Sequence, residues 1–174
     1  MALRKILTEP NRVLRQKSLP VEKVDEDLRR LMDDMLETMY AAPGIGLAAI
    51  QVGIPKRVIV LDLARKDEPK NPMYFVNPEI INKSQNPSSY EEGCLSVPGQ
   101  FAEIERPDKC HIKFLDYFGQ PKEIKAEGML ATCVQHEIDH LEGILFIDYL
   151  SKLKKSMIIK KLSKHKKEIE RIVV

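Results

Sequence analysis

Residues 135–140 read QHEIDH and contain the pattern His-Glu-x-x-His, with its two histidines at positions 136 and 140. Residues four apart on a helix lie almost above one another, about 6 Å along the axis, so both imidazoles can reach one metal ion. Glu137 lies about 100° round the helix from His136, where a carboxylate can take a proton from water held by that ion. Five-residue patterns also arise by chance, so the motif alone leaves an ordinary surface helix as the alternative.

The flanking residues favour a buried helix from Gly128 to Glu142 over a surface helix. Its apolar residues surround the axis instead of forming one stripe, and Gly143 is a natural stop. Two histidines, a glutamate and an aspartate inside a buried helix need partners, and a metal ion is the simplest partner for them. The context therefore strengthens the prediction of a metal site.

A third ligand has to come from elsewhere in the chain, and Cys94 is the best candidate. It lies in EEGCLSVPG, residues 91–99, where glycine and a proline-glycine turn predict irregular, exposed backbone. Cys133 lies more than a helical turn below the midpoint of the two histidines, so its short thiol is better placed to line a cavity beside the metal. His111 and His165 are isolated, which is typical of ordinary polar residues. Two imidazoles, one thiolate and an open position form the pattern of a catalytic site.

The composition predicts a globular protein with one domain over residues 1–174. The chain is 43% hydrophobic and 31% charged, with a net charge of +2 that indicates no particular partner. No apolar run approaches the roughly 18 residues needed to cross a membrane, and the N-terminus does not resemble a secretory signal. Three widely spaced cysteines do not suggest a disulfide framework, so we expect a cytoplasmic protein.

Apolar periodicity predicts the other elements of secondary structure. An amphipathic helix begins at Asp25, buries one stripe and ends at Ala41–Gly44; its stripe consists of Leu28, Leu31, Met32, Met35, Leu36 and Met39. Further along, the sequence predicts strands at 57–63 and 74–81, a weaker strand near Ser89, a hairpin of strands at 109–117 and 121–125, and a lysine-rich helix at about 151–171 with Ser151 as its cap. Cys110 is predicted to be an inert residue of the hairpin.

The segment GIGLAAIQ, Gly44–Gln51, matches neither common phosphate-loop pattern. Its small side chains instead permit another backbone or an extended ligand to approach closely. Gln51 is the one polar residue of this run, and a buried amide must hydrogen-bond. Residue type alone favours a structural tie for Gln51 over a catalytic donor.

Three segments together resemble the signature motifs of the peptide deformylase family: GIGLAAIQ at Gly44–Gln51, EGCLSVP at Glu92–Pro98 and QHEIDH at Gln135–His140. They occur in the family's order and approximate spacing, and the resemblance extends over essentially the whole chain. It implies the bacterial type with a helical C-terminus and an α+β fold. In that fold antiparallel sheets pack around a central, buried HExxH helix, with an N-terminal amphipathic helix and a C-terminal basic helix.

By this resemblance, Cys94, His136 and His140 hold one divalent metal ion, physiologically Fe(II), with zinc, nickel or cobalt able to occupy the same site. The implied reaction is hydrolysis of the N-formyl group from the formylmethionine of nascent polypeptides, with release of formate. Glu137 would act as general base and then as general acid. The Gln51 side chain and the Leu95 backbone N–H would stabilise the oxyanion, which makes Gln51 a catalytic donor after all.

The resemblance also implies a peptide site next to the metal. The methionine pocket would be formed by Ile45, Tyr90, Met129, Thr132 and Cys133, of which Tyr90 and Thr132 replace residues that are often aliphatic in relatives. The peptide backbone would run as an added strand along Ile45–Gly46 and along Tyr90–Gly93, which includes Glu92. Phe101 stands where many relatives carry a basic residue. Asp139 and Arg106 are predicted to orient the ligands.

The lysine-rich end has two interpretations. Its lysines, at 152, 154, 155, 160, 161, 164, 166 and 167, can solvate the outer face of a docked helix, which we favour, or can make a weak contact with ribosomal RNA. The expected partners are formylmethionyl nascent peptides, with no membrane contact and a monomeric state. An endopeptidase with the same motif is disfavoured because no downstream ligand is evident. A non-catalytic metal-binding protein would need neither Glu137 nor Gln51.

Overall fold

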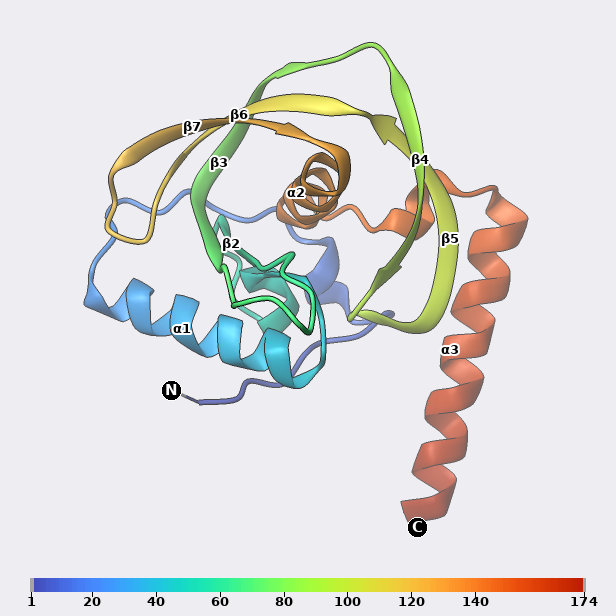
Figure 1. Ribbon diagram of the computed structural model, residues 1–174. Coiled ribbons are helices and arrows are strands. Elements are labelled where there is room, and N and C mark those ends of the chain that lie inside the picture. The colour runs from blue at the N-terminus through green and yellow to red at the C-terminus, as the bar shows by residue number, and fades with distance from the viewer. Residues whose placement is uncertain (1, 174) are drawn as a thin grey trace.

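The computed structural model describes residues 2–173, and the side chains of that range up to His165. Helices and two antiparallel sheets make up the chain, as Figure 1 shows, so the predicted α+β class is confirmed. Within these residues no helix is long and apolar enough to cross a membrane. Lys166 and Lys167 of the predicted basic face lie outside the described side chains.

The larger sheet has five strands in the order β1-β2-β3-β6-β7, each antiparallel to its neighbour. Its strands are β1 (Gly46–Ala48), β2 (Val58–Leu61), β3 (Met73–Lys83), β6 (Lys109–Leu115) and β7 (Pro121–Glu127). The predicted strands at 57–63 and 74–81 are confirmed as β2 and β3, and the predicted hairpin as β6 and β7. The short strand β1 lies in the small-residue segment for which the sequence indicated no strand.

The smaller sheet pairs β4 (Pro87–Cys94) with β5 (Val97–Pro107). The weak strand expected near Ser89 is confirmed as β4, but β5 was not predicted. In β5 the buried positions include a charged residue, Arg106, while Phe101 is largely exposed, so the alternation of apolar and polar residues is hidden. Cys94 is the last residue of β4 and pairs with Val97, but the register of the pairing shifts between Gly93 and Cys94, so the backbone is irregular there, as expected, although it remains part of a strand.

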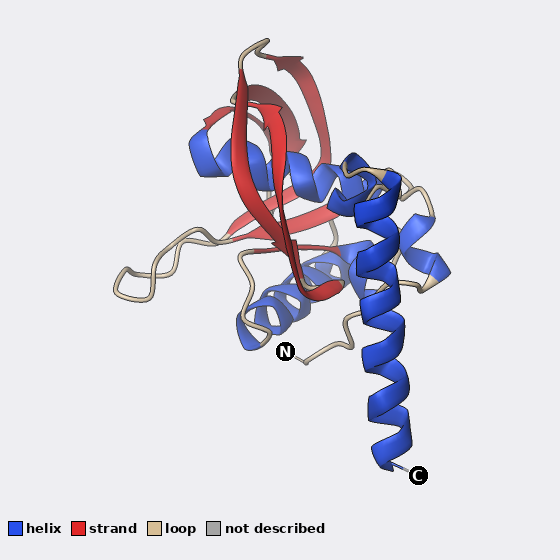
Figure 2. Cartoon of the chain, turned by 90° about the vertical axis from the view of Figure 1, so that its right-hand side faces the viewer, coloured by secondary structure: helices blue, strands red, loops and turns tan. Residues whose placement is uncertain are grey.

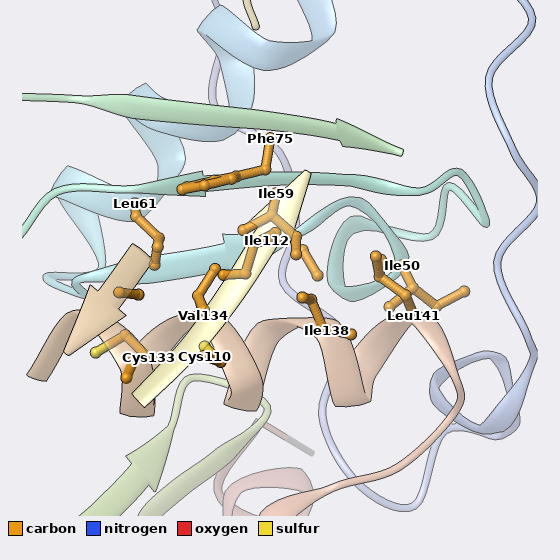
Figure 3. Close-up of a cluster of buried hydrophobic side chains, with 13 residues drawn as sticks. Ile50, Ile59, Leu61, Phe75, Cys110, Ile112, Cys133, Val134, Ile138 and Leu141 are labelled. Carbon is orange, nitrogen blue, oxygen red and sulfur yellow. The ribbon is translucent and has the colours of Figure 1, made fainter. Parts of the chain in front are cut away.

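Helix α2 (Gly128–Leu141) packs against one face of the five-stranded sheet, where Figure 3 shows the shared core. Ile59, Leu61, Phe75 and Ile112 of the sheet are completely buried there, together with side chains of α2 such as Val134. The predicted helix is confirmed, and Gly143 follows it with a φ of 75°. A Cβ at that glycine would collide with the Arg15 carbonyl oxygen, so the stop requires glycine.

Helix α1 (Glu26–Ala41) covers the opposite face of the sheet (Figure 1). Asp25, where the sequence predicted the helix to begin, caps it by accepting a hydrogen bond from the Leu28 N–H at 2.9 Å. Within β2, Val58 and Val60 pack with α1, while Ile59 and Leu61 pack with α2. A strand buried on both faces is apolar throughout, which explains the unbroken run in β2.

The C-terminal part consists of a 3₁₀ helix, η3 (Phe146–Tyr149), followed by α3 (Lys152–Val173). The predicted terminal helix is confirmed, and the Ser151 Oγ accepts a hydrogen bond from the Lys154 N–H at 3.2 Å. Figure 2 shows α3 passing the two-stranded sheet and extending away from the rest of the chain. Phe146 and Ile147 pack with Val97 and Ile104 of β5. Two further 3₁₀ turns are η1 (Arg12–Arg15) and η2 (Ala49–Val52).

Candidate metal and catalytic centre

Three potential metal ligands meet where the end of β4 faces α2. The donor atoms of Cys94, His136 and His140 all lie within 4.8 Å of one another. The Cys94 Sγ is 3.3 Å from the His140 Nε2, and the two imidazole centroids are 5.1 Å apart. The α-helical spacing puts the two histidines on one face, and the β4–β5 hairpin brings the cysteine to them. The three predicted ligands are therefore adjacent, and Cys133 is not among them.

The chemistry of this donor set fits a divalent cation. One thiolate and two imidazoles suit iron, zinc, cobalt or nickel. Burial acts to lower the pKa of His136, but its hydrogen bonds to Cys94 and Glu92 outweigh burial and raise that pKa to about 10. Burial and the neighbouring His136 lower the pKa of His140. The cluster thus attracts one positive charge, which a metal ion can supply in place of a proton.

A chain of buried charged groups orients His136. Its Nδ1 donates to the Glu92 Oε1 at 2.9 Å, which leaves the Nε2 to face the other donors. Arg106 donates to both Glu92 oxygens, at 2.7 and 3.0 Å, and to the Asp139 Oδ2 at 2.8 Å. Burial acts to raise the pKa of Glu92, but the bonds from His136 and Arg106 outweigh burial and lower it. The Glu92 carboxylate is thus engaged with His136, so only its main chain can serve a bound peptide.

Glu137 lies beside the cluster in a site that perturbs its carboxyl. The residue is only 5% exposed, and this burial raises its pKa to about 7. No described residue hydrogen-bonds its Oε2. Gly46 makes room for the carboxylate, because a Cβ there would lie 2.6 Å from the Glu137 Oε1. A carboxyl with a pKa near neutrality can both accept and return a proton at working pH.

The Gln51 side chain is held by hydrogen bonds at both ends of its amide and reaches the ligand cluster. Its Oε1 accepts a hydrogen bond from the Ala48 N–H at 2.9 Å, and its Nε2 donates to the Ser96 Oγ at 3.0 Å. The same Nε2 lies 3.6 Å from the Cys94 Sγ. Gln51 is thus a structural tie whose amide nitrogen also reaches the ligand cluster. Leu95 directly follows Cys94 in the two-residue turn between β4 and β5.

A cavity of about 550 Å³ opens onto this cluster. All of the predicted substrate-binding residues line it: Ile45, Gly46, Tyr90, Glu92, Gly93, Met129, Thr132 and Cys133. Cys94, Gln51, Leu95, His136 and Glu137 line it as well. Burial, with a smaller effect of Glu137, raises the pKa of the Cys133 thiol to about 12. Cys133 is therefore a protonated, largely apolar part of the cavity wall at neutral pH.

Sequence reasoning missed several residues of the site. Ile6, from the N-terminal segment, lines the cavity, and the ring of Phe146 stacks on His136 with centroids 6.1 Å apart. Neither residue belongs to a motif, so the sequence carried no signal for them. Phe101, which the family resemblance had already singled out, also lines the cavity and covers Gly93, where a Cβ would lie 2.6 Å from its ring. Its register opposite Gly93 became visible only with the pairing of β4 and β5.

The other cysteine and histidines considered in the sequence lie apart from the cluster. Cys110 is buried in the core, and burial raises its pKa to about 11. His111 lies 2.9 Å from the Glu123 carboxylate on the neighbouring strand, and His165 is exposed on α3. None of the three lines the cavity.

Comparison with known proteins gives a consistent result. The family model described as "Polypeptide deformylase" matches residues 3–156. A peptide deformylase of Pelagibacter ubique is 67% identical over 174 residues, which is 100% of both chains. The actinonin complex of peptide deformylase from Ehrlichia chaffeensis has a TM-score of 0.91 and 46% identity, and the match covers 95% of this chain and 98% of that one. A Met-Ala-Ser-bound class I type b enzyme from Acinetobacter baumannii has a TM-score of 0.80 and 36% identity, over 86% of this chain and 99% of that one.

Proposed function

Because the chain belongs to the polypeptide deformylase family of metal-dependent hydrolases, we propose that it removes the formyl group from N-formylmethionine at the start of nascent polypeptides. The observation that carries this proposal is a cluster of three metal donors, two of which, Cys94 and His136, line the same cavity as Glu137 and Gln51. An ion-binding protein without activity would need the donors alone. The products are formate and a free amino terminus, and the reaction belongs in the cytoplasm, where nascent chains are made.

One divalent metal ion per chain would be held by Cys94, His136 and His140. Such an ion polarises a carbonyl oxygen and lowers the pKa of water. We propose Fe(II) as the physiological ion, with zinc, nickel and cobalt as substitutes that suit the same donors. Elemental analysis of anaerobically purified protein tests this choice, and a zinc content near one per chain with little iron would contradict it.

Glu137 would move the proton that hydrolysis requires. Water adds to the formyl carbon as its proton passes to the Glu137 carboxylate, and the C–N bond then breaks as that proton passes to the departing amine. Burial favours this exchange, because it raises the pKa of Glu137 to about 7. Close packing against Gly46 holds the carboxylate in position.

Gln51 and Leu95 would stabilise the oxygen of the formyl group as it becomes negative. The Gln51 amide is already oriented, because its Oε1 is held by the Ala48 N–H and its Nε2 points past Ser96 toward Cys94. A donor that needs no reorganisation favours the transition state. The Leu95 N–H, one residue after the proposed cysteine ligand, would be the second donor.

The formylated peptide would lie as an extended strand between β1 and β4. Among the described residues, β1 pairs only with β2 and β4 only with β5, so each strand has one edge left for a peptide. Main-chain hydrogen bonds along these edges would tolerate different downstream sequences. The methionine side chain would enter the part of the cavity lined by Met129, Thr132 and Cys133.

Formate release from formyl-Met-Ala-Ser by anaerobically purified protein tests the activity. We expect turnover by the wild type and a loss of about 10²–10⁴-fold in Glu137→Gln, with metal content unchanged. Equal turnover by the variant would contradict the proposed base. Cleavage of internal peptide bonds instead of the formyl group would favour an endopeptidase, and the absence of any turnover would favour a binding protein.

A second proposal concerns a contact between α3 and the ribosome. Its exposed lysines include Lys152, Lys154, Lys160, Lys161 and Lys164, whereas Lys155 pairs with Asp148 at 2.7 Å. Such a helix can contact the phosphates of ribosomal RNA with low affinity. We propose that the enzyme itself is a monomer. Binding that weakens with salt and is lost when the chain is trimmed at Lys164 would support this contact. Ribosome binding that is unaffected by salt and by trimming at Lys164 would indicate that the lysines only solvate the outer face of α3.

A further inference from the structure

Tyr149 at the end of η3 touches two charged residues that lead to the metal ligands. Its hydroxyl donates to the Asp139 Oδ2 at 2.6 Å. The Arg106 guanidinium lies over its ring, 4.9 Å from the centroid. Arg106 comes from β5 and Asp139 from α2, so Tyr149 joins the C-terminal segment to both elements. No motif of the sequence includes this tyrosine.

From these contacts an unbroken series of hydrogen bonds reaches His136. Arg106 donates to the same Asp139 oxygen at 2.8 Å and to both oxygens of Glu92, which in turn accepts from the His136 Nδ1. Each bond involves a charged group and is therefore stronger than a neutral one. The carboxylates of Asp139 and Glu92 thus fix the Arg106 guanidinium. Arg106 in turn fixes the Glu92 carboxylate, which orients the His136 imidazole.

Asp139 is the least enclosed of the three charged residues between Tyr149 and His136. Its side chain is 18% exposed, compared with 4% for Arg106 and 5% for Glu92. Water can compete for a carboxylate at that position and weaken its pair with Arg106. Tyr149 opposes this competition in two ways, because its hydroxyl occupies the Asp139 oxygen and its ring covers the guanidinium.

The other imidazole has no such series. The Nδ1 of His140 has no hydrogen-bond partner among the described residues. His136 is therefore the ligand whose orientation depends on buried charges. The segment η3 supports His136 a second time, because Phe146 stacks on its ring with an interplanar angle of 25°.

We propose that Tyr149 is a positioning residue for the metal centre, which acts through Asp139, Arg106 and Glu92 on the orientation of His136. This inference rests on the proposed metal site, but not on the identity of the substrate. Anchoring of the C-terminal helix is a separate matter. Asp148 contributes to it through ion pairs with Arg15 at 2.6 Å and Lys155 at 2.7 Å, and Ile158, Ile159 and Leu162 of α3 pack against the β5 and η3 side chains, all without Tyr149.

The release of metal measures this role directly. Replacing a direct partner of a ligand typically costs about 10–100-fold in metal affinity. Tyr149 acts through further residues, so we expect Tyr149→Phe to release metal about 2–3-fold faster and Tyr149→Ala about 10-fold faster, at the low end of that range. The phenylalanine variant keeps the ring over Arg106 and loses only the hydroxyl.

The experiment loads wild type and variants with Co(II) without oxygen and follows its transfer to a chelator. The visible spectrum of bound Co(II) reports ligand geometry, and urea unfolding of the metal-free proteins reports stability. Leu153→Ala is the matched control, because Leu153 follows on α3, is 71% exposed and is outside the hydrogen-bond series. We expect the control to match the wild type in both release rate and spectrum.

The graded increase in release rate, with a changed spectrum in Tyr149→Ala, would support the positioning role. Lower stability with a wild-type release rate and spectrum would overturn it, since Tyr149 would then be merely structural. If Tyr149→Phe and Tyr149→Ala both released metal at the rate of the wild type and of the Leu153→Ala control, the positioning role would be overturned as well. The rate of metal release tests the positioning role of Tyr149 independently of the proposed deformylase activity. If the proposed activity were wrong, only the formate assay would show it.

Discussion

Gln51→Glu separates the two functions of the Gln51 side chain. The substitution keeps the shape and the Oε1 acceptor, so the Ala48 N–H retains its 2.9 Å hydrogen bond. It removes the amide donor that lies 3.0 Å from the Ser96 Oγ and 3.6 Å from the Cys94 Sγ. The Ser96 hydroxyl can turn and donate to the new carboxylate, but the proposed oxyanion loses one of its two donors and keeps only the Leu95 N–H.

The expected magnitudes differ for the two functions. Loss of an oxyanion donor costs about 10²–10³-fold in kcat, or roughly 2.7–4 kcal/mol. Rearrangement of one hydrogen bond changes the free energy of unfolding by about 0.5–1.5 kcal/mol, and burial of a carboxyl group at this position, where Gln51 is 1% exposed, adds to that loss. Gln51→Glu should therefore remain folded and lose most of its turnover. Ser96→Ala is the complementary control: it removes the structural partner, keeps the amide and should retain kcat within about 3-fold while losing about 1 kcal/mol of stability.

The assay combines formate release from formyl-Met-Ala-Ser with urea unfolding, on samples matched for metal content. The refuting result is a Gln51→Glu variant whose kcat stays within about 3-fold of the wild type, well short of the expected loss. Gln51 would then be a structural tie alone, as its residue type first suggested. Equal losses of kcat in Gln51→Glu and Ser96→Ala would likewise refute an independent donor role.

Three further predictions follow from packing and burial. Gly46→Ala would place a methyl group 2.6 Å from the Glu137 Oε1, and displacement of a base by about 1 Å costs on the order of 100-fold in kcat/KM; an unchanged rate at full metal occupancy would contradict that close contact. Burial acts to raise the pKa of Asp148, but its cationic partners outweigh burial and lower it, so its stabilisation is present above the unfolded value of about 3.9 and is lost as pH falls through the folded pKa. In urea unfolding, Asp148→Asn should therefore be less stable than the wild type at pH 7 and equal to it in strong acid, whereas a difference independent of pH would exclude a role for the charge. After metal removal at pH 8, half-buried Cys94 should react with iodoacetamide before Cys133, whose pKa is raised to about 12; equal labelling by mass spectrometry would show that burial does not protect Cys133.

The spacing of apolar residues was sufficient to predict the elements that bury one face or both faces. Helix α1 follows its predicted stripe, and β2 follows its apolar run, because side-chain direction in a regular element repeats with fixed spacing. Strand β5 escaped prediction for the converse reason. Arg106 is buried where the pattern requires an apolar residue, and its partners Glu92 and Asp139 lie on other elements.

The buried charges around His136 illustrate a limit of sequence reasoning. Arg106 is 33 residues from Asp139, and Glu92 is 44 residues from His136. Contacts at such separations leave no spacing that could be read along the chain. The sequence predicted that Arg106 and Asp139 orient the ligands. It could not show that the Glu92 carboxylate faces His136 or that Tyr149 contacts Asp139 and Arg106.

The sequence by itself determined the chemistry that is available: two histidines one helical turn apart, an adjacent glutamate and a cysteine beside a turn. These follow from residue type and helical spacing, which are local properties. Only the tertiary structure decided how that chemistry is tuned, by burying Glu137 against Gly46 and by aiming the Gln51 amide at Cys94. The physical reason is that burial and hydrogen-bond direction depend on segments that meet only when the two sheets enclose α2.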